Sequence, residues 1–480
     1  MRRLSRATLG DVPATIAAPR GRTVGGVGIV HFGPGAFHRA HQAAYVDALL
    51  DHDPRWGLAA VSLRSRGTVE ALAAQDGLYT LAIRDAESSM RVIDAHRHFL
   101  GPEDAVATRA LLADPATRLV TSTVTEKGYC LAADGTLDLG HPDIVHDLGW
   151  PAVPRSVIGW IVAGLAARRD AGFAPFVPMP CDNLANNGAK LHAALVAFAR
   201  VDDAALADWI ADTVRVPSTM VDSITPAADD ALYADVAAAL GIEDRAPVQR
   251  EAFSQWVIED VGVADMPDLA SVGATVTSDV AGFEKAKLRI LNGAHSTLAY
   301  AGLLRGHTSV AEAMRDAELA AFVDAMIRDD IMPMLPAVPG LDLDGYRAAV
   351  LKRFTNPAIV HRLDQIAQDG SQKMPYRLGD TLLANRRAGR MPHHVVMALG
   401  CWVAFLVKRA EAGIPLIDPA AESLIAAVAG ATPRQAMAAL IERGLGIPAV
   451  LRDDGAACAE LEAAAAMALS GQLSLRDRLL

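Results

Sequence analysis

The feature that most constrains the fold is an apolar run that ends in glycine and is followed by a helix-like segment. Residues 27–33 read V-G-I-V-H-F-G, a β-rich stretch that stops at a glycine. Residues 35–50 continue with apolar side chains at helical spacing. Strand, glycine turn and helix in this order are typical of the opening of a dinucleotide-binding unit. We therefore expect an α/β fold with a mostly parallel sheet.

The rest of the chain separates into an α/β part and a helical part. Further strands are predicted at 58–63, 79–83, 89–95, 118–125 and 173–180, with an amphipathic helix over 155–171. From about residue 283 the runs become alanine- and leucine-rich and helical in period. We predict a Rossmann-like NAD-binding domain over 1–282 and a mostly α-helical substrate and catalytic domain over 283–480.

Composition and charge restrict the possible partners. The chain has 480 residues, enough for two or three domains, and 51% of them are hydrophobic. Its formal net charge of −11 argues against nucleic acid and anionic membranes, because both need a cationic surface. The N-terminus has no apolar run of signal-peptide length, and no apolar stretch reaches the ~18 uncharged residues that a membrane span needs. We expect a cytoplasmic protein, and its oligomeric state stays open.

The four cysteines lie far apart in the sequence, at 130, 181, 401 and 458. They form no C-x-x-C pair, so neither a structural zinc site nor a disulfide framework is favoured. We expect reduced thiols and no metal.

The glycine loop supplies two of the three glycines of G-x-G-x-x-G. Gly33 permits the tight turn and Gly35 lets the backbone approach a pyrophosphate, while His38 takes the third position. A glycine turn without a ligand is the alternative. An acidic residue normally follows the second strand to bind the ribose, but Arg64 stands in this region. An arginine here can accept a 2′-phosphate or belong to a solvated loop, so NADP is not excluded beside NAD.

The segment F-E-K-A-K-L-R-I-L-N-G-A-H-S-T-L at 283–298 is the most informative for chemistry. On a regular α-helix Lys287, His295 and Asn292 share one face, at about 0°, 80° and 140°. A partly buried lysine has a lowered pKa and can act as a base near neutral pH. The amide can donate to a carbonyl or alkoxide oxygen, and the imidazole can orient a hydroxyl. The alternative is a snorkelling lysine beside a core histidine.

Together these residues resemble a known family. K-x-x-x-x-N-x-x-H over Lys287, Asn292 and His295 is similar to the signature of the polyol-specific long-chain dehydrogenases, the mannitol dehydrogenase family. Further matches are H-F-G-P-G-A-F-H-R-A-H-Q (31–42), T-V-T-E-K-G-Y (123–129), C-D-N-L-A-N-N-G (181–188), M-V-D-S-I-T-P (220–226), Q-W-V-I-E-D (255–260), L-N-G-A-H-S (291–296) and D-G-S-Q-K-M-P (369–375). They occur in order over most of the chain.

The resemblance implies a metal-independent NAD(P)-dependent oxidoreductase whose substrate lies between its two domains. It implies that Lys287 is the general acid/base, that Asn183 and Asn292 stabilise the oxyanion, and that His295 contacts substrate. Asn187 lies so close to Asn183 in sequence that the choice between them stays open.

The same resemblance implies further roles for residues in the other motifs. Glu126 and Glu284 match acidic positions on a proton route to the lysine, and Asp222 and Lys373 belong to the substrate shell. The residues implied on the cofactor side are Gly33, Gly35, Ala36, Phe37, His38, Arg64, Thr125 and Glu126.

Two departures from the family pattern bear on the substrate. Ser223 replaces a usual arginine in the motif around Asp222, so one arginine contact is missing. Where the mannitol-oxidising branch tends to carry arginine shortly before D-G-S, residues 361–368 look more like the fructuronate reductase (mannonate oxidoreductase) branch. We therefore expect D-fructuronate and D-mannonate as the substrate pair. Their carboxylate needs a cation, for which the candidates are Lys373, Arg377 and Arg362.

Other functions remain as alternatives. In the same class, the substrate would be a neutral polyol such as mannitol, sorbitol or an arabinitol. From other classes, the glycine loop would serve an S-adenosylmethionine-dependent methyltransferase or a non-catalytic nucleotide-sensing module. A methyltransferase leaves the lysine, asparagine and histidine face unexplained, and a sensing module would tolerate the loss of Lys287.

Overall fold

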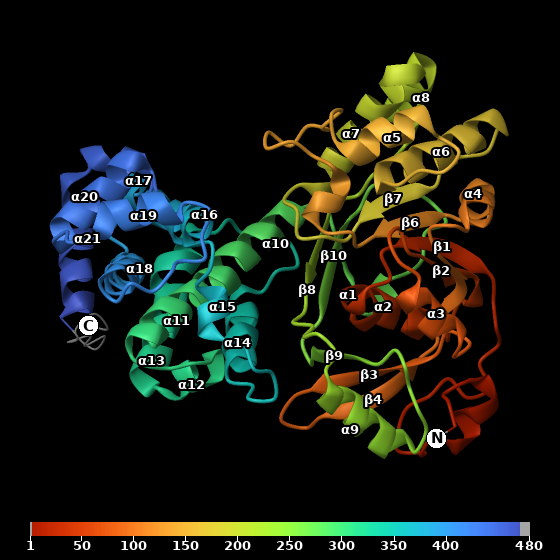
Figure 1. Cartoon of the computed structure of the whole chain (residues 1–480), viewed down its shortest axis with the longest axis horizontal. Coiled ribbons are helices and arrows are strands. Elements are labelled where there is room, and N and C mark those ends of the chain that lie inside the picture. The colour runs from red at the N-terminus through yellow and green to blue at the C-terminus, as the bar shows by residue number, and fades with distance from the viewer. Residues whose placement is uncertain (1, 471–480) are drawn as a thin grey trace. The chain divides into compact units, whose positions relative to one another are not determined.

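The computed structural model describes residues 2–470, and the chain forms two compact units, Met1–Ala281 and Gly282–Leu480 (Figure 1). The first unit is built on a five-stranded parallel sheet in the order β5-β2-β1-β6-β7. These strands are β1 (Val27–Phe32), β2 (Gly57–Val61), β5 (His96–Leu100), β6 (Leu119–Ser122) and β7 (Val177–Pro180). β1 lies at the centre, β2 and β5 follow on one side of it, and β6 and β7 follow on the other. This is the strand order of the Rossmann fold, and it reverses between β1 and β6; a Rossmann-like domain with a parallel sheet was predicted here.

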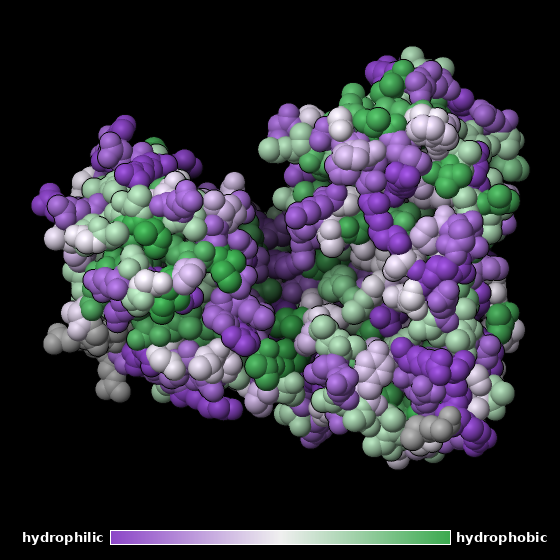
Figure 2. All heavy atoms as spheres, viewed as in Figure 1, coloured by the Kyte–Doolittle hydropathy of each residue, from purple (hydrophilic) through white to green (hydrophobic). Residues whose placement is uncertain are grey.

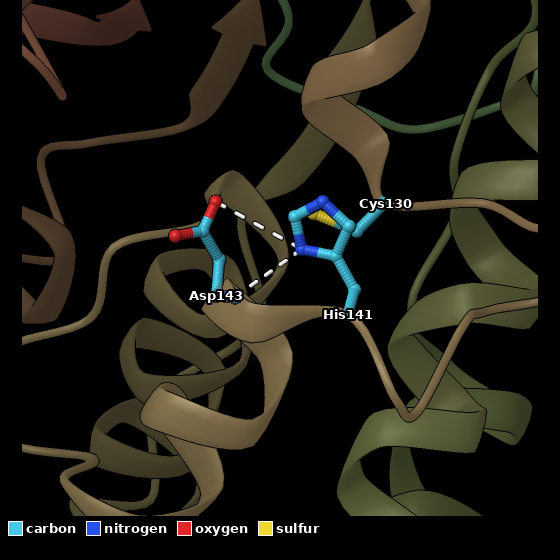
Figure 3. A group of neighbouring side chains, drawn as sticks. All are labelled: Cys130, His141 and Asp143. Atoms are coloured by element: carbon cyan, nitrogen blue, oxygen red, sulfur yellow. Dashed lines mark hydrogen bonds and ion pairs between the residues drawn. The ribbon is translucent and has the colours of Figure 1, made fainter.

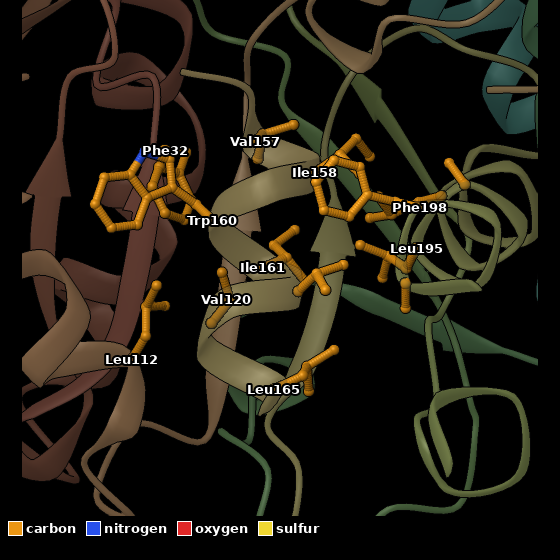
Figure 4. Close-up of a cluster of buried hydrophobic side chains, with 14 of the residues drawn as sticks. Phe32, Leu112, Val120, Val157, Ile158, Trp160, Ile161, Leu165, Leu195 and Phe198 are labelled. Atoms are coloured by element: carbon orange, nitrogen blue, oxygen red, sulfur yellow. The ribbon is translucent and has the colours of Figure 1, made fainter. Parts of the chain in front are cut away.

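Helices cover both faces of this sheet, which explains the continuous apolar run of β1. Phe32 points to a core that includes Trp160 of α6 (Val157–Asp170), as Figure 4 shows. Ile29, three residues earlier in β1, points to the opposite face of the sheet. The core on that face includes Trp256. Because successive side chains of a strand alternate in direction, a strand buried on both faces is largely apolar, and the polar exception in β1 is the buried His31.

Two smaller sheets complete the first unit. One contains β4 (Ser89–Ile93), β3 (Tyr79–Arg84) and β9 (Val248–Glu251), and the other β11 (Thr275–Thr277), β10 (Gln255–Glu259) and β8 (Thr219–Asp222). The predicted strands at 79–83 and 89–95 therefore form an antiparallel hairpin outside the main sheet. Leu81 of β3 pairs in parallel with Val248 of β9. The other helices are α1 (Ala36–Ala40), α2 (Gln42–Leu49), α3 (Gly67–Ala73), α4 (Ala105–Ala113), α5 (Pro142–Gly149), α7 (Asn187–Asp202), α8 (Ala204–Thr213) and α9 (Asp230–Leu240).

The second unit is helical, as the sequence predicted. Its α-helices are α10 (Val280–Ala286, which begins just before the unit boundary), α11 (Gly293–Leu304), α12 (Val310–Arg315), α13 (Ala317–Ala325), α14 (Leu343–Phe354), α15 (Leu363–Ile366), α16 (Gly370–Met374), α17 (Asp380–Arg387), α18 (His393–Glu411), α19 (Ala421–Val428), α20 (Pro433–Arg443) and α21 (Gly455–Leu469). α18 is buried over most of its length and packs against α11 and α21. A Cβ on Gly400 would lie 2.7 Å from Ala464, so glycine permits the close approach of α21.

Between residues 282 and 470 the chain forms three turns of π-helix, at Lys287–Asn292, Met326–Ile331 and Pro375–Gly379. The first of them contacts the other two. Asp330, in the second, is buried and accepts hydrogen bonds from the N–H groups of His394 and Val395, in the first turn of α18, at 2.9 and 3.0 Å. A carboxylate at a helix start satisfies backbone donors that otherwise lack partners. These turns therefore help to fix the centre of the unit.

The outer surface of each unit is mixed. Figure 2 shows polar and apolar residues interspersed on the visible face of both units. Among residues 2–470, no helix combines the length and the apolar character needed to cross a bilayer. All four cysteines are free thiols, and three of them are buried.

Candidate active site

The glycine loop follows β1 at the edge of the sheet where the strand order reverses. Gly33 has a φ of +88°, and a Cβ there would lie 2.2 Å from the carbonyl oxygen of Thr123, so only glycine fits. Gly35 precedes α1, and no heavy atom outside its immediate neighbours lies nearer than 3.9 Å to a Cβ built there. The loop thus leaves open space beside Gly35. In open parallel sheets a dinucleotide binds at this reversal point.

The predicted single helix over 35–50 is interrupted. α1 ends at Ala40 and α2 begins at Gln42, because His41 has a φ of −115° and a ψ of −90°. The Nε2 atom of His41 lies 2.9 Å from the carbonyl oxygen of Gln255 in β10. This contact links the residue at which the helix is interrupted to another sheet. The interruption could therefore not be predicted from the periodicity of residues 35–50.

His38, at the third position of the glycine motif, turns into the core. Its ring stacks on His31 with 3.4 Å between centroids, and its Nε2 lies 3.0 Å from Nε2 of His96. All three side chains are fully buried. Burial lowers the pKa of each imidazole, to about 3 for His31 and well below the usual range for the other two. A contact between His38 and a cofactor would therefore use its backbone, since its side chain belongs to this neutral cluster.

The other residues predicted on the cofactor side lie on loops at the same edge of the sheet. Arg64 follows β2 and forms an ion pair with Asp143 at the start of α5, which raises the pKa of the guanidinium. Thr125, after β6, has a φ of +66°, and its N–H donates to Asp182 Oδ1 at 2.9 Å. Glu126 is the next residue and is exposed. Both loops thus follow strands next to β1.

The segment after β7 distinguishes the two candidate asparagines. Asn187 is fully buried, and its Nδ2 donates to the carbonyl oxygens of Asp182 at 3.2 Å and Thr219 at 2.9 Å. Its Oδ1 accepts from the N–H of Thr219 at 2.9 Å. The Asn187 amide therefore joins the end of β7 to β8, whereas Asn183 is exposed. Asp182 accepts hydrogen bonds from two backbone N–H groups and from Tyr129, and burial raises its pKa.

In the second unit, Lys287, Asn292 and His295 lie on one continuous helical segment whose winding changes at the site. α10 leads into the π turn Lys287–Asn292, and α11 follows. The prediction of a regular α-helix through this segment was therefore wrong in its middle. Because the π turn closes i→i+5 hydrogen bonds, the angles of a regular helix do not describe how these three side chains are arranged. Turns of this kind are frequent at functional sites.

Arg377, in the π turn Pro375–Gly379, forms hydrogen bonds at the end of the π turn Lys287–Asn292. Its Nη1 donates to Ser296 Oγ at 3.0 Å and to the carbonyl oxygen of Asn292 at 3.4 Å. A Cβ on Gly293 would lie 3.1 Å from the carbonyl oxygen of Arg377, so the two turns touch along their backbones. Burial lowers the pKa of the guanidinium. Within residues 2–470 no carboxylate lies at ion-pair distance from Arg377, which makes it a half-buried positive charge beside the predicted catalytic segment.

His295 lies in an apolar and aromatic setting and is only 8% exposed. Its ring centroid is 4.5 Å from that of Phe354 and 4.9 Å from that of His361. Burial, followed by the charges of His361, Arg353 and Arg377, lowers its pKa well below the usual range, so the ring is neutral. Its Nε2 has no hydrogen-bond partner among the described atoms of the chain. Such a buried nitrogen can bind a hydroxyl of a ligand.

The remaining predicted residues divide between half-buried and exposed positions. Lys373 Nζ donates to the carbonyl oxygen of Gln368 at 2.7 Å and lies 3.7 Å from Asp369, and burial lowers its pKa. Arg362 is 60% exposed and pairs with Asp364, so its charge is already matched at the surface.

Asp222 is only 5% exposed at the end of β8, and Lys287, Asn292 and Glu284 are half-buried. Ser296 was not predicted as a site residue, although it directly follows His295 in the same segment. Nor were Arg353 and the side chain of His361, which lie in other segments and meet His295 only in the folded chain.

Comparison with known proteins extends this description over the whole chain. Residues 27–271 match the mannitol dehydrogenase Rossmann domain, and residues 279–449 match the mannitol dehydrogenase C-terminal domain. D-mannonate oxidoreductase of Escherichia coli (strain K12) is 41% identical over 401 residues, which are 82% of each chain. Mannitol 2-dehydrogenase of Phaeosphaeria nodorum (strain SN15) is 38% identical over 409 residues, 83% of this chain and 72% of that protein.

A solved structure shows the same architecture. Mannitol 2-dehydrogenase of Pseudomonas fluorescens, in a ternary complex with NAD and D-mannitol, is 34% identical and superposes with a TM-score of 0.80. The match covers 99% of both chains. Two domain matches in sequence order, relatives above 30% identity and a full-length structural match agree with the motifs found above. The chain is a member of the mannitol dehydrogenase family.

Proposed function

We propose that this chain, an oxidoreductase of the polyol and sugar-acid CH–OH class, interconverts D-fructuronate and D-mannonate with NAD. The observation that carries the proposal is the half-buried positive charge of Arg377 beside the segment of Lys287, Asn292 and His295. An anionic substrate would match this charge, which has no carboxylate partner within the described chain. The 41% identity with a D-mannonate oxidoreductase supports the same substrate class.

The residues at the glycine loop fit a dinucleotide. A side chain at Gly33 would collide with the backbone after β6, and the space beside Gly35 is open. Gly33, Gly35, Ala36 and Phe37 would hold the pyrophosphate end, and the loop of Thr125 and Glu126 would lie beside it. When bound, NAD supplies or accepts the hydride. The pairing of Arg64 with Asp143 favours NAD, since a 2′-phosphate would have to draw Arg64 away from this carboxylate.

The chain's own groups then handle the proton and the oxygen charge. In reduction, protonated Lys287 donates from Nζ to the oxygen that becomes the alcohol; in oxidation, neutral Lys287 removes the hydroxyl proton. Asn292 and Asn183 donate N–H groups to the negative oxygen. We choose Asn183 over Asn187 because the Asn187 amide already binds three backbone groups. Neutral His295 binds a substrate hydroxyl through the unpaired Nε2.

A neutral hexitol is the second candidate substrate. The full-length match to a mannitol 2-dehydrogenase bound to D-mannitol favours it, and a neutral substrate needs no cation. Arabinitol and sorbitol belong to the same alternative.

The deciding experiment compares kcat/KM for D-mannonate and D-mannitol, with NAD and with NADP, on one preparation. We expect D-mannonate with NAD to be preferred; a higher value for D-mannitol would refute the proposed substrate. Lys373→Met provides a test within the site. If Lys373 binds the carboxylate, the variant raises the KM for D-mannonate about tenfold or more and leaves the KM for D-mannitol nearly unchanged. Equal effects on both substrates would remove Lys373 from carboxylate recognition.

A further inference from the structure

A cysteine, a histidine and an aspartate converge in the first unit, on the segment that runs from the loop after β6 to the start of α5. The thiol of Cys130, the imidazole of His141 and a carboxylate oxygen of Asp143 each offer one ligand atom, and these atoms all lie within 4.8 Å of one another. Figure 3 shows Asp143 facing the His141 ring, with the sulfur of Cys130 close to the same ring. None of the three has a role in the proposed hydride transfer.

The backbone holds these three residues in place. A short antiparallel turn pairs Leu131 with Leu137 and returns the chain to Cys130, whose carbonyl oxygen accepts from the N–H of Asp138 at 2.9 Å. The N–H of His141 in turn donates to the carbonyl oxygen of Asp138 at 3.0 Å. The cluster is thus set by backbone hydrogen bonds, and Cys130 and His141 meet although ten residues of chain separate them.

The helix that carries Asp143 is equally well fixed. Asp147 of α5 is fully buried and accepts from the N–H groups of Arg155 and Ser156 and from Ser156 Oγ, at 2.6–2.9 Å. Ile144 is fully buried beside it. Side chains projecting from so constrained a scaffold need little rearrangement to bind a common ligand.

The local electrostatics favour a cation. Asp138 and Asp147 lie on the same short segment as Asp143, and the N–H of Asp138 is bonded to the carbonyl oxygen of Cys130 itself. The positive charge that now balances Asp143 is the guanidinium of Arg64, whose side chain is 66% exposed. A metal ion that binds Asp143 would compete with an exposed and weakly held partner.

The donor set indicates which cation fits. Thiolate and imidazole ligands with one carboxylate suit Zn²⁺ and similar borderline ions, whereas Mg²⁺ and Ca²⁺ prefer oxygen alone. In a tetrahedral zinc site the ligand atoms are about 3.3–3.8 Å apart. His141 Nδ1 lies 3.9 Å from Asp143 Oδ2, close to this spacing. Nδ1 also accepts the N–H of Asp143 at 3.2 Å, so its lone pair points toward that residue. Binding would exchange this hydrogen bond for the metal.

We propose that Cys130, His141 and Asp143 form a three-ligand site for Zn²⁺ or a similar ion, in competition with Arg64 for the carboxylate. Water would complete the coordination, as at other three-ligand zinc sites. The site adjoins the loop of Thr125 and Glu126 by sequence and uses the partner of Arg64, so an ion bound here frees Arg64 beside the predicted cofactor loops. It is a site additional to the proposed hydride-transfer residues.

The test titrates the full-length protein with Co²⁺, because a cobalt–thiolate bond gives a near-ultraviolet charge-transfer band that oxygen and nitrogen ligands do not give. We expect the band to saturate at one Co²⁺ per chain and to disappear on addition of Zn²⁺. The Cys130→Ser variant should lose it, while the matched control Cys458→Ser, which removes a thiol elsewhere in the chain, should keep it. A missing band in the unchanged protein, or a band that survives Cys130→Ser, would overturn the proposal.

Two further variants test the other ligands without removing the thiol. His141→Gln should retain a weaker band and bind Co²⁺ at least tenfold less tightly. Loss of a ligand lowers metal affinity at least as much as loss of a residue that hydrogen-bonds to a ligand. Arg64→Ala should tighten binding about two- to fivefold, the effect of removing an exposed competing ion pair. Unchanged affinity in both variants would contradict the assignment even if Cys130 binds cobalt. Thermal unfolding of each variant without metal verifies that the fold is intact.

Discussion

The buried cluster of His31, His38 and His96 makes the first unit sensitive to acid. Burial lowers the pKa of each imidazole in the folded chain, whereas the unfolded chain titrates near the ordinary value of about 6.5. Between the folded and unfolded pKa values the unfolded state binds more protons than the folded state. The stabilising effect of keeping the rings neutral is therefore full above pH 6.5, and the free energy of unfolding falls as the pH drops below it.

The magnitude follows from the linkage between proton binding and unfolding. Each histidine lowers the free energy of unfolding by about 1.4 kcal/mol per pH unit below pH 6.5, so one ring costs about 2 kcal/mol by pH 5. Burial lowers the pKa of His38 and His96 in the same direction, so both rings add to this loss, against a typical total stability of about 5–15 kcal/mol. Because the folded pKa of His31 is about 3, its contribution keeps falling through this whole window.

The assay is urea unfolding of the full-length chain at several pH values from 7.5 to 5, followed by tryptophan fluorescence. His96→Gln removes one titrating ring but keeps a donor and an acceptor for the contact with His38. We expect it to make the fall in the free energy of unfolding below pH 6.5 less steep than in the unchanged chain. His98→Gln serves as the matched control, because His98 lies two residues away on the same strand and is exposed. If His96→Gln and His98→Gln have the same pH dependence as the unchanged chain, the reasoning about burial is refuted.

Four other variants test the site and the second unit. Lys287→Ala should lower kcat about 10²–10⁴-fold while the Kd for NADH, measured by fluorescence, stays within twofold; near-normal turnover would exclude the proposed acid/base role. Asn183→Ala should lower kcat about 10²–10³-fold without lowering the melting temperature, whereas Asn187→Ala should destabilise the chain, and the reverse pattern would exchange their roles. Asp330→Ala should reduce the stability of the second unit by about 2–4 kcal/mol in calorimetry, since two N–H groups at the start of α18 lose a buried acceptor. An unchanged unfolding transition would show that water replaces the carboxylate.

The sequence correctly predicted the parts of the fold that depend on residues close together in the chain. β1, the glycine loop and the helical second unit follow from apolar periodicity and from the conformational freedom of glycine. β5 was not predicted, because His96-Arg97-His98 breaks the apolar run and the burial of His96 depends on the distant His38. The hairpin strands were predicted, but their separate sheet requires β9, which lies far along the chain.

The candidate site was predictable as a set of residues but not as an arrangement. The motif identified Lys287 and Asn292, whereas the π turn between them depends on contact with two other π turns. Sequence could not separate Asn183 from Asn187, because the difference lies in hydrogen bonds to Thr219 on another strand. Such features depend on tertiary contacts, which periodicity and composition do not contain.

The pairing of β3 with β9 also constrains how the chain is made. The parallel contact between Leu81 and Val248 cannot form until Val248, about 170 residues later in the chain, has been synthesised. At a synthesis rate of roughly 5–20 residues per second, the β3–β4 hairpin leaves the ribosome about 10–30 seconds before its partner strand. During this interval the edge of β3 is an unpaired template for other strands. Nascent chains that stop before residue 248 should therefore depend on chaperones more than chains that extend past β9.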